Sequence, residues 1–317
     1  MQTVYLEDYG FVPDIIGTSC ANSIKLKDLE FRVPCGKCLP CQKKRRSEWS
    51  LRLEHEYMFS DSAFFITLTY DEINVPRTKE GFKTLNKKHL QNYIKRLRND
   101  HVKYVSKELN IPKSKVKEVS KPIRYYAIGE YGEKTRRPHY HALIFNMEVG
   151  NLSPFTNQWK NTETGYKFGH VDVGTVTGAS INYVTKYMFK PFGKKDKREK
   201  PFSIMSKGRK NTPYGIIGHA YLDHYGVHHI TSESLEVRDK KGNARRLPKA
   251  YLRRLFTNKE DRLELSRRSY EQHIEKKIKE YENTIVEHYC GKVLDYQNSI
   301  EADLNRHRNT INNTETL

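Results

Sequence analysis

The sequence predicts an α+β fold, built on an antiparallel sheet of split βαβ type with helices packed on one face. Three observations predict this fold. Four segments are enriched in β-branched and aromatic residues, as strands are. Segments between and after them carry apolar residues at helical spacing. The connection between the second and third strand segments is rich in turn residues, which favours a hairpin and therefore antiparallel pairing.

The elements of this core follow in the order strand, helix, strand, strand, short helix, strand, helix, similar to the RNA-recognition-motif (RRM) sheet. The strand segments are FFITLTY (64–70), IRYYAIGEYG (123–132), HYHALIF (139–145) and HVDVGTV (170–176). The helical segments are LNKKHLQNYIKRLRND (85–100), a short one around 154–159, and ASINYVTKYMFK (179–190), which Pro191 ends.

Extensions flank the core on both sides. We expect four parts: 1–60, a cysteine cluster and basic helix; 61–192, the sheet core; 193–257, a basic extension containing Gly and Pro; 258–317, a helix and a disordered tail. The chain before the cysteines has an irregular pattern. A stripe of Ile and Tyr from Tyr270 to Tyr289 predicts the C-terminal helix, which would pack on the core or on another helix.

The composition favours a nucleic-acid partner. The net charge is +19, and a polyanion is the partner that best explains such an excess. The 21 tyrosines suit stacking on single-stranded bases, although tyrosines also pack in sheets. We expect no membrane association, because the chain has neither a run of 18 apolar residues nor a basic amphipathic helix with a Trp/Phe/Leu face. The N-terminus lacks the pattern of a secretory signal.

Two histidines flank a tyrosine at the start of the third strand, in RPHYHALIF (137–145). Because side chains alternate along a strand, His139 and His141 share one face and Tyr140 points to the other. Such a pair is more often merely exposed or hydrogen-bonded than metal-binding. However, Glu130 ends the preceding strand, and a hairpin would return it beside them. One carboxylate and two imidazoles suit Mg²⁺ or Mn²⁺, which would polarise a phosphoryl oxygen.

The last helix of the core carries Tyr183 and Tyr187, with Lys186 between them. Residues four apart on a helix are neighbours, about 5–6 Å between Cβ atoms, so the two phenols share a face. A phenol with a pKa of about 10 is a poor nucleophile at neutral pH. A metal-activated phosphodiester and a nearby ammonium would lower the barrier to its attack. The alternative is an amphipathic helix whose tyrosines only pack against the sheet.

Together these segments resemble the HUH (histidine–hydrophobe–histidine) superfamily of rolling-circle replication initiators. RPHYHALIF is similar to its metal-binding motif, YVTKYMFK to its tyrosine helix in the two-tyrosine form, and FFITLTY to its first strand motif. The segments GEYGEKTRRPHYHALIF, PCGKCLPCQKKRRSEWSLRLEHE and FSIMSKGRKNTPYGIIGHAYLDHYG resemble the replication proteins of microviruses, in particular of the gokushovirus group. The resemblance runs from about Val33 to about Tyr225.

The resemblance implies a DNA endonuclease with nucleotidyltransferase activity that nicks and rejoins single-stranded origin DNA. His139 and His141 would be metal ligands with Glu130 as the third, and Lys186 would stabilise charge or orient the phosphate. One of Tyr183 and Tyr187 would form a 5′-phosphotyrosyl bond while the freed 3′-OH primes the host polymerase. The other would cut the regenerated origin so that the ends are rejoined.

The chain contains no G-x-x-x-x-G-K-[ST] phosphate loop. We therefore expect it to lack a helicase motor and to depend on a host helicase for unwinding. The resemblance places this activity in the cytoplasm of the bacterial host.

Four of the five cysteines precede the core, and three of them form C-x₂-C-x₂-C at Cys35, Cys38 and Cys41. Without an export signal, such thiolates favour a metal site over disulfides. A closed tetrahedral Zn²⁺ site would take Cys20 as its fourth ligand, or His55 instead. An iron–sulfur cluster and packed, reduced cysteines are the alternatives. A zinc site would staple the N-terminal region and direct the KKRR run (43–46) at DNA, unless those cations only form a solvated helix face.

Two other functional classes remain open on the sequence. A non-catalytic, zinc-bearing regulator that binds single-stranded DNA would keep the basic surface and need neither tyrosine. A one-tyrosine transposase or relaxase-like nuclease would use Tyr187 alone, with Tyr183 packed. An assay for a covalent protein–DNA adduct separates all three classes.

Overall fold

The computed structural model describes residues 3–6, 10–13, 20, 24–25, 32–187, 192–193, 195–206, 216–229, 236–265, 267–268 and 279. The chain divides into two compact units, residues 1–47 with 249–317 and residues 48–248. The expected four-part division therefore stays a prediction. The Ile and Tyr stripe of the expected C-terminal helix, the expected disordered tail and Cys290 lie outside the described residues.

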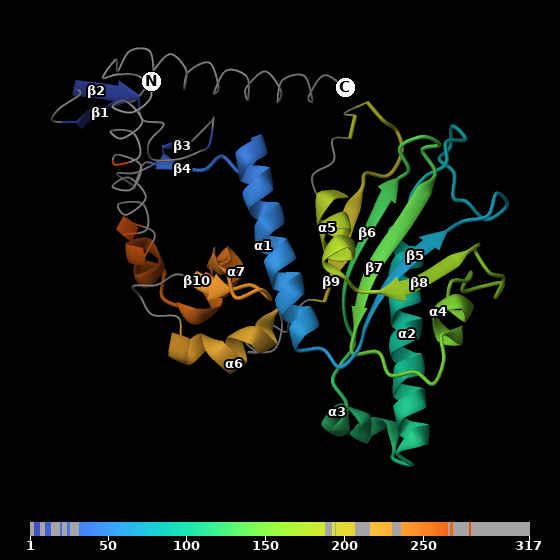
Figure 1. Cartoon of the computed structure of the whole chain (residues 1–317). Coiled ribbons are helices and arrows are strands. Elements are labelled where there is room, and N and C mark those ends of the chain that lie inside the picture. Colours follow the sequence, from blue (N-terminus) through green and yellow to red (C-terminus); the bar gives the residue numbers. More distant parts are fainter. Residues whose placement is uncertain are drawn as a thin grey trace. The chain divides into compact units, whose positions relative to one another are not determined.

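The unit of residues 48–248 is built on a five-stranded sheet with the order β8-β5-β7-β6-β9 (Figure 1). Its strands are β5 (Ala63–Thr69), β6 (Arg124–Tyr131), β7 (Pro138–Phe145), β8 (Val171–Thr175) and β9 (Phe202–Met205). All neighbouring strands pair antiparallel, and β6 and β7 form the expected hairpin. The predicted α+β class with an antiparallel sheet is confirmed.

Helices cover both faces of this sheet, whereas the sequence predicted helices on one face. Helices α2 (Lys87–Glu108) and α4 (Ser153–Asn157) pack on the face that bears Ile66 and Leu68, called here the α2 face. Helix α5 (Gly178–Lys186) and the end of α1 (Leu39–Met58) pack on the other face, called the α5 face (Figure 1). The reason is that β6 and β7 are buried on both sides along most of their length, so both faces must be covered.

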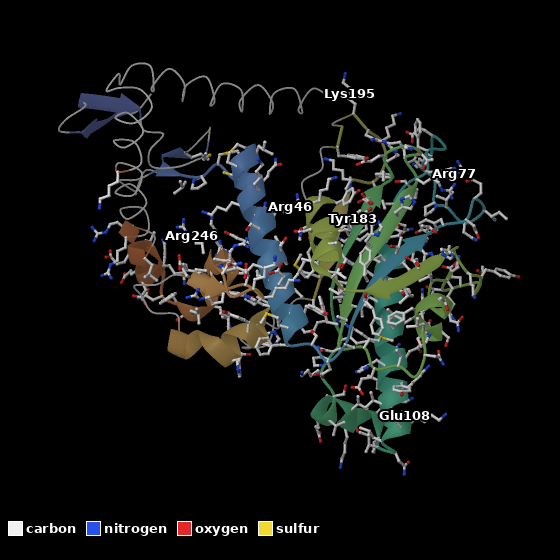
Figure 2. All side chains as sticks on the ribbon, viewed as in Figure 1. Arg46, Arg77, Glu108, Tyr183, Lys195 and Arg246 are labelled. Carbon is white, nitrogen blue, oxygen red and sulfur yellow. The ribbon has the colours of Figure 1, made fainter. Side chains whose placement is uncertain are left out.

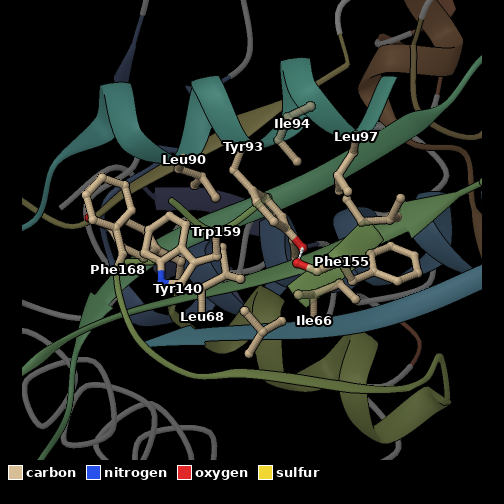
Figure 3. Packing of buried hydrophobic residues seen from close by; sticks show 14 of the residues in the cluster. Ile66, Leu68, Leu90, Tyr93, Ile94, Leu97, Tyr140, Phe155, Trp159 and Phe168 are labelled. Carbon is tan, nitrogen blue, oxygen red and sulfur yellow. Dashed lines mark hydrogen bonds between the residues drawn. The ribbon is translucent and has the colours of Figure 1, made fainter. Parts of the chain in front are cut away.

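The α2 face holds the larger core of the unit. Leu90, Tyr93, Ile94 and Leu97 point from α2 onto the sheet, as their helical spacing predicts (Figure 3). Tyr93 donates a hydrogen bond at 3.1 Å to the carbonyl of Phe155, so its polar end is satisfied inside the core. Asn86 caps α2, its side chain accepting from the backbone N–H groups of Lys88 and His89.

The fifth strand, β9, lies beyond the expected end of the core at residue 192 and pairs with β6. Four residues at a sheet edge carry little periodic signal, because their place in the sheet depends on main-chain hydrogen bonds to a distant strand.

Several short elements lie outside the sheet. They are β1 (Thr3–Leu6), β2 (Gly10–Pro13), β3 (Ile24–Lys25), β4 (Arg32–Val33), η1 (Lys113–Lys115), α3 (Val116–Val119), α6 (His219–His229), β10 (Glu236–Arg238), β11 (Ala244–Arg246) and α7 (Lys249–Leu255). The pairs β1–β2 and β3–β4 are hairpins in a region that the sequence predicted to be irregular. None of the described helices combines the length and the apolar character needed to cross a bilayer.

Candidate active site

Glu130, His139 and His141 lie on the α5 face of neighbouring strands, as strand alternation predicts. Glu130 stands directly opposite His139 in the β6–β7 register, and His141 follows two residues along β7. The Nε2 atom of His141 lies 3.1 Å from Oε1 of Glu130. Both side chains are almost fully buried, so this polar contact is made away from bulk water.

The phenol of Tyr183 reaches the same two groups from α5 (Figure 2). Its hydroxyl donates a hydrogen bond to Oε1 of Glu130 at 3.1 Å and lies 3.4 Å from Nε2 of His141. The Tyr183 ring meets the imidazole edge-on, with 4.8 Å between the ring centroids. The structure therefore brings Tyr183 onto the predicted metal ligands.

The other two residues predicted on this helix lie next to Tyr183. The rings of Tyr183 and Tyr187 are 4.9 Å apart between centroids. The Nζ atom of Lys186 lies 5.9 Å from the centroid of the Tyr187 ring. Both phenols and one ammonium therefore gather at the end of α5, and Tyr183 is the one placed against Glu130 and His141.

Local sequence features explain why α5 presents Tyr183 in this way. Only Val176 and Thr177 separate β8 from the helix, so α5 must fold back onto the adjacent face. Thr177 and Ser180 form a capping box that defines the first turn. Ile181 and Val184 are buried against the sheet, which leaves Tyr183 at the edge of the contact, 37% exposed.

Burial sets the charge states of two of these groups. Burial, the hydrogen bond with Tyr187 and the charge of Glu130 raise the pKa of Tyr183 above its ordinary value, so its phenol is neutral at physiological pH. Burial and the neighbouring His141 lower the pKa of His139. A neutral imidazole is the form that binds a metal.

The chemistry of these side chains fits a divalent cation. The Oε2 atom of Glu130 is buried and makes no hydrogen bond within the described part of the chain, so a hard oxygen ligand is unused. As placed, however, Glu130, His139 and His141 do not form a group gathered closely enough to hold one ion; among the described residues only a set of cysteines does. His139 would have to change its rotamer to join the other two.

Two residues at this site escaped the sequence analysis. Thr67 stands opposite His141 in the β5–β7 register, and its Oγ1 lies 3.1 Å from Nδ1 of His141. Phe65 stacks on the same imidazole, with 5.8 Å between centroids and 11° between planes. Both belong to the FFITLTY strand, where they occupy the α5 face. Strand alternation could have found them only once the pairing register between β5 and β7 was known.

The predicted cysteine cluster is also present, in the unit of residues 1–47 and 249–317. The Sγ atoms of Cys20, Cys35, Cys38 and Cys41 all lie within 4.8 Å of one another, and all four are free thiols. Cys38 and Cys20 are 3.6 Å apart between sulfurs, near the ~3.8 Å of a tetrahedral zinc site with Zn–S bonds of about 2.3 Å. The cluster could therefore hold a metal ion such as zinc.

The backbone around the cluster supports a thiolate at Cys35. Although burial opposes ionisation, the N–H groups of Cys38 and Lys37 donate to its sulfur, and its pKa is lowered to about 7. Burial raises the pKa of Cys41 to about 11. A metal ion would draw that thiol into the thiolate form as well.

His55, the alternative fourth ligand, is not part of this group. Its Nε2 atom lies 2.8 Å from the carbonyl oxygen of Arg238, and its ring stacks on Tyr221 with 3.6 Å between centroids. The helical spacing that made His55 a candidate says nothing about these partners, which are more than 160 residues away in sequence.

Comparison with known proteins agrees with this fold and site. Residues 63–192 match a family of replication-associated proteins that includes the type named ORF2. That segment contains Glu130, His139, His141 and the tyrosines of α5. The part of the chain that forms the sheet and the site thus has the sequence of a replication-associated protein of this class.

The chain is also similar to individual phage proteins. It is 32% identical to replication-associated protein VP4 of Bdellovibrio phage phiMH2K, over 56% of this chain and 53% of that protein. It is 31% identical to replication-associated protein ORF2 of Spiroplasma virus 4, over 52% of this chain and 50% of that protein. It is 28% identical to replication-associated protein ORF4 of Chlamydia phage 1, over 53% of this chain and 40% of that protein.

These matches confirm the resemblance to microvirus replication-associated proteins. The matched region spans about half the length of those relatives, or less. No solved structure matches the chain.

Proposed function

We propose that this protein initiates replication of phage DNA by nicking one strand at the origin and later rejoining it, with Tyr183 as the first nucleophile. The observation that carries the proposal is the contact of the Tyr183 hydroxyl with Glu130 and His141. A phenol packed only for stability has no need of a buried carboxylate and imidazole. The match to the family of replication-associated proteins and the phage relatives support the replication role.

The reaction conserves the phosphodiester bond. The Tyr183 oxygen attacks the phosphorus, the bond from phosphorus to the 3′-oxygen breaks, and a 5′-phosphotyrosyl diester forms. Oε1 of Glu130 accepts the phenolic hydrogen bond and so offers an acceptor for the proton, while the departing 3′-oxygen takes a proton from water. Attack of a 3′-OH on the phosphotyrosine reverses these steps, so joining needs no nucleotide.

Other residues of the site have supporting roles in this scheme. Glu130, His141 and a turned His139 would hold Mg²⁺ or Mn²⁺, which when bound polarises the scissile phosphoryl group. Lys186 offsets the negative charge of the phosphate. Tyr187, one turn along the helix, makes the second cleavage once the origin is regenerated.

Partners follow from the same scheme. The net charge of +19 suits single-stranded DNA at the origin. The freed 3′-OH is extended by the host polymerase, and a host helicase unwinds the duplex, which places the protein in the cytoplasm of the bacterial host.

A covalent-adduct assay tests the assignment. The full chain is incubated with Mn²⁺ and single-stranded oligonucleotides that tile the genome encoding it, and denaturing gels detect a protein–DNA adduct. We expect Tyr183→Phe to lose the first adduct, Tyr187→Phe to keep it but fail to release and rejoin, and Tyr166→Phe, at an exposed loop tyrosine, to behave as wild type. EDTA should abolish adduct formation.

The other outcomes distinguish the alternatives. An adduct that survives Tyr183→Phe and disappears in Tyr187→Phe contradicts the assignment of Tyr183 and supports a one-tyrosine nuclease. DNA binding without an adduct under any divalent metal supports the non-catalytic DNA-binding regulator.

The cysteine cluster supports a separate assignment, a structural Zn²⁺ held by Cys20, Cys35, Cys38 and Cys41. A closed set of four thiolates leaves no open position for chemistry, so its role is to tie Cys20 to the start of α1. We expect one zinc per chain by elemental analysis and its loss in Cys38→Ser, with Cys290→Ser as the matched control. Iron and visible absorption in place of zinc would show an iron–sulfur cluster instead.

A further inference from the structure

Thr67 is the residue that completes the hydrogen bonding of His141. It lies on β5 directly opposite His141 on β7, and its Oγ1 is 3.1 Å from Nδ1 of the imidazole. The other ring nitrogen, Nε2, faces Glu130 and Tyr183. Both nitrogens of His141 are therefore engaged, one by a hydroxyl and the other by the groups of the proposed reaction.

The contacts define one tautomer of the imidazole in the metal-free protein. An ionised carboxylate can only accept hydrogen bonds, so the 3.1 Å contact with Oε1 of Glu130 requires the proton to be on Nε2. Nδ1 then has a bare lone pair and needs a donor. The hydroxyl of Thr67 can supply that donor because it rotates freely about its C–O bond.

Metal binding requires the opposite tautomer. A cation shared with Glu130 needs the lone pair of Nε2, so the proton must sit on Nδ1 and Thr67 must accept it. A hydroxyl can both donate and accept, whereas a carbonyl or carboxylate can only accept and an apolar side chain can do neither. The change moves one proton from Nε2 to Nδ1 by exchange with water and leaves the imidazole neutral.

We propose that Thr67 is a positioning residue whose hydroxyl reverses its hydrogen bond with His141 and so allows the imidazole to change tautomer when a metal binds. This inference rests on the proposed function for the identity of the metal ligands. Thr67 acts through His141 and touches neither DNA nor metal. Partners in this position orient metal-binding histidines, and their removal typically costs about 10- to 100-fold in metal affinity.

Two substitutions at Thr67 test the role of its hydroxyl. Thr67→Val keeps the shape and the β-branch but removes the hydrogen bond, and Thr67→Ser keeps the hydroxyl. The matched control is Thr69→Val, on the same strand and the same face, where the hydroxyl donates at 3.3 Å to the carbonyl of His170 rather than to an imidazole.

The first measurement is Mn²⁺ affinity of the full chain by calorimetry or electron paramagnetic resonance, without DNA. We expect Thr67→Val to bind Mn²⁺ about tenfold or more weakly, and Thr67→Ser and Thr69→Val to bind within about twofold of wild type. The second measurement is ¹⁵N NMR of the His141 ring. It should report protonated Nε2 in the metal-free wild type and protonated Nδ1 with Mg²⁺.

Several results would overturn the inference. Wild-type Mn²⁺ affinity in Thr67→Val is one, and an unchanged tautomer on adding Mg²⁺ is another. Equal weakening in Thr67→Ser and Thr67→Val would show a packing effect rather than a hydrogen bond. Normal Mn²⁺ binding with the expected Thr67 dependence, but no DNA adduct, would overturn the proposed nicking function and leave the role of Thr67 standing.

Discussion

At the scale of single residues, strand alternation separates the groups of the HYH motif. Tyr140 is fully buried on the α2 face, where its hydroxyl accepts from the backbone N–H of Asn86 at 2.7 Å and lies 3.0 Å from the hydroxyl of Tyr70. These bonds pin β7 from behind, while His139 and His141 face α5. The tyrosine between the two histidines thus fixes the strand that carries them.

Gly132 controls the space around His139. A Cβ atom at this position would lie 3.1 Å from Cε1 and 3.3 Å from Nδ1 of the His139 ring. We expect Gly132→Ala to push the imidazole aside and weaken metal-dependent cleavage by about tenfold, since displaced ligand orientation typically costs about 10- to 100-fold. The measurement is the rate of adduct formation as Mn²⁺ is titrated.

The control for this prediction is Gly174→Ala in β8, where an added Cβ would meet only the carbonyl oxygen of Phe65 at 3.9 Å, an ordinary contact. Cleavage by Gly132→Ala at the wild-type rate and Mn²⁺ dependence would show that the position of His139 does not limit the reaction.

At the scale of elements, α5 turns a sequence pattern into a site. Its capping box and short connection to β8 fix where the helix starts, and Ile181 and Val184 fix which side faces the sheet. The i, i+4 spacing of Tyr183 and Tyr187 was readable from the sequence. Which phenol meets Glu130 was not, because that depends on how the helix is rotated against the sheet.

The Thr177 cap should contribute measurably to stability. Its side chain accepts from the N–H of Ser180, and removal of such a cap costs about 1 kcal/mol. We expect Thr177→Ala to lower the free energy of unfolding of the sheet unit by about that amount in urea titrations. Thr164→Ala, in an exposed loop, should change it by less than about 0.5 kcal/mol. Equal losses in both variants would contradict a specific capping role.

At the scale of the whole molecule, buried histidines couple stability to pH. Burial lowers the pKa of His55 to about 4, below the ~6.5 expected in the unfolded chain. Between these values the unfolded state binds more protons, so stability is present above pH ~6.5 and is lost as pH falls toward 4. For His55 the slope is at most about 1.4 kcal/mol per pH unit.

Denaturant unfolding at several pH values between about 7 and 5 measures this slope. His55→Gln should flatten it, while His170→Gln, at an exposed position, should leave it unchanged. A slope that is the same in wild type and His55→Gln would assign the acid sensitivity to other groups.

The charge of the chain predicts strongly salt-dependent DNA binding. With a net charge of +19, binding to single-stranded DNA should weaken as salt rises, with a log–log slope of about −0.7 per phosphate contact. Fluorescence anisotropy with a labelled oligonucleotide measures the slope. A slope near zero would contradict an electrostatic DNA-binding surface.

The sequence by itself determined the features that repeat locally. Alternation along β7 set the opposite faces of His139 and Tyr140, helical spacing set the phenol pair, and turn residues set the β6–β7 hairpin. The C-x₂-C-x₂-C spacing placed three cysteines together in the same way. Each of these depends on neighbours within a few residues, so the pattern is visible along the chain.

Only the tertiary structure decided the contacts between distant segments. It added β9 to the sheet, covered both faces with helices, and brought Cys20 rather than His55 to the other cysteines. It also placed Thr67 on His141 and Tyr183 on Glu130. These contacts depend on strand register and on the rotation of a helix against a sheet, which are set by packing across the whole unit and leave no periodic trace in the sequence.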